Sequence, residues 1–144
     1  MTVQPSAASL EMIRRLVGFA TVSRDSNLAL IHWVQEYLQG LGIDSELVPD
    51  ETGKKANLYA TLGPRDKGGV VLSGHTDVVP IDRQEWHTDP FAIVPKDGRL
   101  YGRGTSDMKS FAAIVLALVP VFLRRGLKTP VHLAFYYYEE VGCI

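Results

Sequence analysis

A three-layer α/β domain, in which a mixed sheet carries helices on both faces, is the fold class that the sequence predicts. Two observations favour it. Some segments have apolar residues at helical spacing, others alternate at strand spacing, and the two kinds follow one another along the chain. The chain also has 144 residues, of which 46% are hydrophobic, and this is enough to form one core. We therefore expect a single domain over residues 1–144.

Three segments have the apolar spacing of helices. The first covers residues 10–20. The second follows Ser26 or Asn27, either of which can cap it, and ends at a pair of glycines. The third and longest covers residues 108–125, is apolar on most sides and stops at Gly126, so it is expected to be buried against the sheet.

Four segments have strand patterns. Residues 43–48 and 57–62 form a plausible hairpin. Residues 70–72 are a short continuous apolar run, typical of a strand covered on both faces. Residues 131–138 alternate cleanly and end at two glutamates.

The middle of the chain has little regular structure. Residues 76–91 form an irregular segment of a length usually reserved for functional loops. A hairpin is expected next, because Asp97 and Gly98 are a strong turn signal between two short apolar runs. Arg103 and Lys109, on either side of the next turn, are expected to be solvated charges.

Composition excludes several classes of function. The net charge of −1 shows no basic excess, so nucleic acid is not an expected partner. The longest apolar run, residues 111–123, is too short to span a bilayer, and no secretion signal is visible. A single cysteine, Cys143, excludes an internal disulfide and favours a cytoplasmic location.

Five polar residues lie where predicted strands or helices meet turns. His75 and Asp77 follow one predicted strand, Asp107 precedes the long helix, and Glu139 and Glu140 follow the last strand. Ligand sites in α/β sheets lie outside the carboxyl ends of the strands. We therefore interpret these residues as part of one two-metal hydrolase site.

The histidine block has two interpretations. His75 can bind zinc as a neutral imidazole, and Asp77 can accept the proton of the other ring nitrogen because it lies on the same side of an extended backbone. The alternative is a loop histidine beside a turn aspartate. Among the other histidines, His32 is expected on a helix surface and His87 on the surface or a pocket wall. His132 lies roughly 26 Å from Glu140 along an extended strand, too far to share the site.

The acidic blocks also have two interpretations each. Asp107, taken alone, is a helix N-cap, but its two oxygens can instead bridge two cations about 3.5 to 4 Å apart. Glu139 and Glu140 are either a solvated strand end or a pair with separate tasks. In the second case one binds metal and the other accepts a proton from water.

Together these blocks resemble a family of zinc-dependent deacylases and exopeptidases that includes aminoacylases, desuccinylases and carboxypeptidases. The resemblance is carried by residues 74–80, 86–91, 98–109 and 139–142, in that order and spacing. Residues 55–64 are most similar to the acetylornithine deacetylase branch of the family.

The resemblance implies a role for each residue. His75 would bind one metal ion, Asp107 would bridge two and Glu140 would bind the second. Glu139 would be the general base and acid, and Asp77 would orient His75. The cofactors would be two divalent ions, zinc or alternatively cobalt. The substrate would be a small N-acylated amino acid, with removal of the acetyl group from N-acetylornithine in arginine biosynthesis as the reaction.

The family also implies parts that these 144 residues do not supply. Its members are longer, are expected to be homodimers, and have a lid or dimerisation domain, a further acidic ligand and a C-terminal histidine. Residues 1–144 would then be the N-terminal part of the catalytic domain, binding zinc weakly and hydrolysing little on its own. A sister deacylase or exopeptidase is one alternative, and a non-catalytic protein that assembles with another chain is the other.

Overall fold

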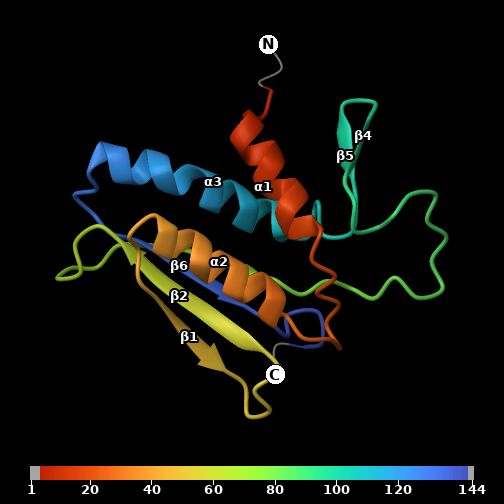
Figure 1. The fold of residues 1–144 in the computed structure, drawn as a ribbon, viewed down its shortest axis with the longest axis horizontal. Helices are drawn as coiled ribbons and strands as arrows, with labels where there is room; N and C mark the ends of the chain where they lie inside the picture. The colour runs from red at the N-terminus through yellow and green to blue at the C-terminus, as the bar shows by residue number, and fades with distance from the viewer. Residues whose placement is uncertain (1–3, 143–144) are drawn as a thin grey trace.

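A four-stranded mixed sheet in the order β1-β2-β6-β3 forms the base of the protein (Figure 1). Its strands are β1 (Ser45–Pro49), β2 (Ala56–Leu62), β6 (Val131–Tyr136) and β3 (Val70–His75). β2 is antiparallel to β1 and β6, whereas β3 is parallel to β6. This arrangement confirms the predicted mixed sheet. It also brings the carboxyl ends of β3 and β6 to the same edge.

Within residues 4–142 of the computed structural model, three helices lie on one side of this sheet. α2 (Leu28–Gly40) packs on β2 and β1, α3 (Lys109–Arg125) packs on β3, and α1 (Ala7–Val17) packs on α3. A Cβ added to Gly74 in β3 would lie 2.9 Å from the Phe111 ring of α3, so a side chain there would force that ring to move. The buried strand residues under the helices are Ala56, Leu58, Ala60, Leu62, Leu133 and Phe135.

The other face of the sheet carries no helix within residues 4–142. The Tyr59 and His132 rings stack there with centroids 5.7 Å apart, and Thr61 is hydrogen-bonded to Nδ1 of His132 at 3.0 Å. Helices are predicted on both faces of the sheet, and in the described part of the chain they cover one face. The α/β class itself is confirmed.

Three details differ from the predictions or refine them. Val70 and Val71 are 57% and 53% exposed because β3 is the edge strand, so the expectation that both faces of this strand are covered is wrong for its first half. The outer side of α3 exposes Ile114 and Leu118, so that helix is buried on one side only. The hairpin of β4 (Val94–Lys96) and β5 (Arg99–Tyr101) is confirmed.

The structure describes residues 4–142, so Cys143 lies outside it. In this range no helix combines the length and apolar character needed to cross a membrane. β3 and β6 are parallel neighbours, and the first turn of α3 packs against Gly74 near the end of β3, so these three elements lie together.

Candidate metal centre

The predicted site residues converge where β3 and β6 end. The last residue pair in their parallel register joins His75 to Tyr136. Beyond β6 the chain turns at Tyr138, whose φ of 69° is left-handed, and this turn presents Glu139 and Glu140 beside the end of β3. Side chains distant in the sequence thereby gather at the edge that the sequence predicted.

His75 is the centre of the group. Its side chain is 3% exposed, and Nδ1 lies 2.9 Å from the backbone oxygen of Asp77. A carbonyl can only accept, so Nδ1 is the donor and carries a proton. Nε2 faces the opposite way, 3.0 Å from Oδ1 of Asp107 and 3.8 Å from Oε2 of Glu139. The ring nitrogen available to a metal is therefore Nε2, and it points at carboxylates.

The Asp107 side chain contacts His75 and does not cap the helix that follows it. α3 begins at Lys109 with Met108 in the cap position, and no side chain donates or accepts a capping hydrogen bond there. The simple N-cap interpretation of Asp107 is therefore wrong. Its carboxylate is 72% exposed and reaches His75 instead, and the peptide bond from Asp107 to Met108 is cis.

Glu139 and Glu140 complete the cluster. Ligand atoms of His75, Glu139 and Glu140 lie within 4.8 Å of one another. Burial raises the pKa of Glu140, and the nearby charge of Asp107 raises it further, because both disfavour another anion at this position. A cation would relieve that repulsion, and one imidazole with several carboxylates is a donor set that suits zinc.

Asp77 joins the two halves of the site. Its carboxylate, 2% exposed, lies 3.4 Å from Nδ1 of His75, but the shorter contact to that ring comes from the Asp77 backbone. The carboxylate oxygens also accept hydrogen bonds from the backbone N–H groups of Glu139, at 3.4 Å, and Glu140, at 3.2 Å. Asp77 therefore contacts the imidazole that it was predicted to orient and, in addition, holds the turn that carries both glutamates.

Buried polar residues that the sequence did not single out fix the segment after β3. Thr21 donates to the backbone oxygen of Thr76, and Ser23 donates to that of Val78 at 2.9 Å. Asn27 donates to the hydroxyl of Thr76 at 3.1 Å and also pairs with the backbone of Ala56. The sequence predicts Asn27 only as a candidate helix cap. The signal that marks these residues is burial of short polar side chains, which composition and spacing do not reveal.

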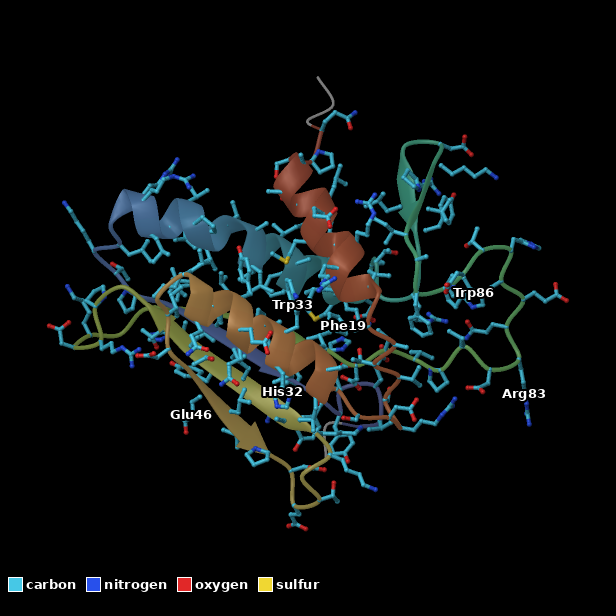
Figure 2. The ribbon with its side chains drawn as sticks, viewed as in Figure 1. Phe19, His32, Trp33, Glu46, Arg83 and Trp86 are labelled. Carbon is cyan, nitrogen blue, oxygen red and sulfur yellow. The ribbon has the colours of Figure 1, made fainter. Side chains whose placement is uncertain are left out.

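The remaining histidines lie outside this group, as predicted. His32 is exposed on α2, and His87 is exposed on the long loop next to Trp86 (Figure 2). His132 lies on the open face of the sheet. Lys109, in contrast, is 1% exposed and donates to the backbone oxygen of Phe19, so its interpretation as a solvated charge is wrong.

A pH titration tests the electrostatics of His75. Burial lowers its pKa, but the hydrogen bonds to the Asp77 backbone and the Asp107 carboxylate outweigh burial and raise the pKa above 6.5. The protonated ring thus stabilises the fold below the unfolded pKa, and this contribution is lost as the pH rises through the raised folded value. We expect an NMR titration of the metal-free protein to give a midpoint above 6.5 for His75. Asp107→Asn should lower that midpoint, and Asp66→Asn, which changes an exposed acid in the loop before β3, should not.

Known proteins resemble this chain in sequence and in fold. The model of peptidase family M20/M25/M40 matches residues 71–144, just over half of the chain and including every residue of the cluster. The chain belongs to this family. Membership of family M20 indicates that the protein comes from a lineage of metal-dependent hydrolases.

Named relatives of this M20 chain include acetylornithine deacetylases. That of Proteus mirabilis is 43% identical over 74% of this chain and 29% of the relative. That of Pasteurella multocida is 42% identical over 76% of this chain and 30% of the relative. The chain thus spans under a third of the length of these relatives.

Solved structures share the fold. The M20 family metallo-carboxypeptidase Sso-CP2 of Sulfolobus solfataricus matches with a TM-score of 0.84 and 23% identity, covering 96% of this chain and 32% of that one. Human carnosine dipeptidase 1 matches with a TM-score of 0.75 and 26% identity, covering 94% and 33%.

Proposed function

We propose that this M20 chain belongs to a metal-dependent amidohydrolase that removes the acetyl group from N-acetylornithine, a reaction of arginine biosynthesis. The observation that carries the proposal is the convergence of His75, Asp107, Glu139 and Glu140 at the end of β3 and β6. The identity of 43% to a relative named as an acetylornithine deacetylase supports the choice of substrate.

The residues of the cluster would hold two zinc ions, or cobalt in their place. His75 and Asp107 would bind one ion, and Asp107 and Glu140 the other. When bound, such ions polarise an amide carbonyl and make a water molecule more acidic. Catalytic zinc usually has three protein ligands, so two for each ion predict weak zinc binding by these 144 residues alone.

Glu139 would move the proton in this reaction. Its carboxylate lies 3.8 Å from Nε2 of His75 and is half-buried at the same edge of the sheet. There it would accept a proton from the attacking water and pass it to the nitrogen of the leaving amine. Asp77 would keep Glu139 in place by accepting a hydrogen bond from its backbone N–H group.

Metal content tests the site. We expect the chain, purified and equilibrated with zinc, to retain more metal than His75→Ala and Glu140→Ala, because each change removes a ligand. His87→Ala, which alters an exposed histidine, should retain as much as the unchanged chain. Equal metal in all four proteins contradicts the proposal and favours a non-catalytic protein.

A substrate panel on a full-length version of the protein tests the specificity. We expect acetylornithine to be hydrolysed faster than succinyl-diaminopimelate or dipeptides. Because human carnosine dipeptidase 1 shares the fold at 26% identity, an exopeptidase is the second candidate. Faster turnover of dipeptides would select it.

A further inference from the structure

A buried lysine lies behind the turn that carries Glu139 and Glu140. Lys55, the residue before β2, is 5% exposed, and its ammonium donates to the backbone oxygen of Ser23. The same ammonium lies 4.0 Å from the centroid of the Tyr138 ring and 5.9 Å from that of Tyr137. An ammonium over an aromatic face is attracted by the ring, more strongly when both are removed from water.

Tyr138 is the residue at which the chain leaves β6 for the glutamates. Its φ of 69° is uncommon for a residue with a side chain, so something must hold it. The neighbouring Tyr137 donates its backbone N–H to Oδ1 of Asn57 at 3.2 Å, and the two tyrosine rings meet edge to face at 4.6 Å. Lys55 and Asn57 therefore fix the turn on the side of β6.

The far side of the turn is fixed by the Asp77 carboxylate, through the backbone N–H groups of Glu139 and Glu140. Burial lowers the pKa of Lys55, and the nearby charge of Asp77 opposes this by favouring the protonated lysine, so Asp77 and Lys55 attract each other. The turn is thus held between a buried cation on one side and a buried anion on the other.

We propose that Lys55 is a positioning residue, which holds Tyr138 by a cation–π contact and so sets where Glu139 and Glu140 meet His75. The effect on the turn stands on the contacts alone, whereas the consequence for metal binding rests on the proposed function. A lysine needed only for stability would loosen the whole sheet when removed. A positioning lysine loosens the turn selectively.

Amide hydrogen exchange separates these two cases. In Lys55→Met and Tyr138→Leu we expect the Glu139 and Glu140 amides to exchange about tenfold faster, because the attraction to the ring is lost. The Leu133 amide in the centre of β6 should not change. Lys55→Arg and Tyr138→Phe keep a cation and a ring, and should restore slow exchange. Lys54→Met, an exposed neighbour, is the matched control.

Two results would overturn the inference. One is exchange at Glu139 and Glu140 that stays slow in both Lys55→Met and Tyr138→Leu. The other is faster exchange at Leu133 by the same factor. Because Tyr138 is only half-buried, Tyr138→Leu supplies the answer even where Lys55→Met does not fold.

Zinc titration of the same variants tests the consequence. We expect Lys55→Met and Tyr138→Leu to bind zinc about tenfold more weakly than the unchanged chain, as is typical when a group that orients a metal ligand is lost. Absence of zinc binding by the unchanged chain contradicts the proposed function, while the exchange data still decide the role of Lys55. Unchanged affinity in both variants contradicts the inference.

Discussion

Asp77→Ala should lower the free energy of unfolding by about 3 to 5 kcal/mol, the cost of removing one partner from a buried group of charges. The carboxylate is 2% exposed and faces His75 on one side and two backbone N–H groups on the other. Its charge also favours the protonated forms of Lys55 and Lys109, both buried. Alanine would leave the two backbone N–H groups without their acceptor and would remove a negative charge from beside His75, Lys55 and Lys109.

Urea unfolding monitored by circular dichroism measures this loss. Asp77→Asn should lose less, about 1 to 3 kcal/mol, because its amide oxygen still accepts a hydrogen bond while the charge is gone. Asp66→Ala, which removes an exposed acid, should stay within about 0.5 kcal/mol of the unchanged chain. An Asp77→Ala protein as stable as Asp66→Ala would show that the carboxylate does not hold the two halves of the site together.

The sequence predicted the edge of the sheet at which the site lies, because strand ends can be found from periodicity and turn residues. His75 follows a short apolar run, and Glu139 and Glu140 follow an alternating one. The structure brings these residues within reach of one another, since β3 and β6 are parallel neighbours. Position along the chain was enough for this part of the prediction.

The surroundings of individual polar side chains could not be predicted from their position along the chain. Lys109 stands beside a glycine-rich turn and has the pattern of a solvated charge, yet it is 1% exposed and burial lowers its pKa to about 7. Asp107 has the position of a helix cap, yet it reaches His75. In both cases the deciding partner is distant in sequence: the backbone of Phe19 for Lys109, and β3 for Asp107.

The alternating pattern of a strand also does not predict what covers the second face of the sheet. Alternation in residues 131–138 predicts that one side of β6 is covered, and the helices cover it. Alternation does not say what lies on the other side. There Tyr59 and His132 stack on each other, with no helix above them in the described part of the chain.

Glu139→Gln and Glu140→Gln should have different effects, because Glu139 is proposed as the general base and Glu140 as a metal ligand. In a full-length version of the protein, Glu139→Gln should retain zinc and lower the rate of acetylornithine hydrolysis about 10²- to 10⁴-fold, the usual effect of removing a general base. Glu140→Gln should bind zinc more than about tenfold more weakly, because removing a group that only orients a metal ligand already lowers metal affinity about tenfold.

The metal-free proteins give an independent check. Burial raises the pKa of Glu140, so its ionised form destabilises the folded state. This cost accumulates as the pH rises from the unfolded pKa to the raised folded pKa and is fully present above the latter. Without zinc, Glu140→Gln should therefore melt at a higher temperature than the unchanged chain. With zinc, Glu140→Gln should melt at a lower temperature than the unchanged chain. Calorimetry at pH 7 with and without zinc measures both. Equal loss of zinc in Glu139→Gln and Glu140→Gln would contradict the division of roles and make both glutamates metal ligands.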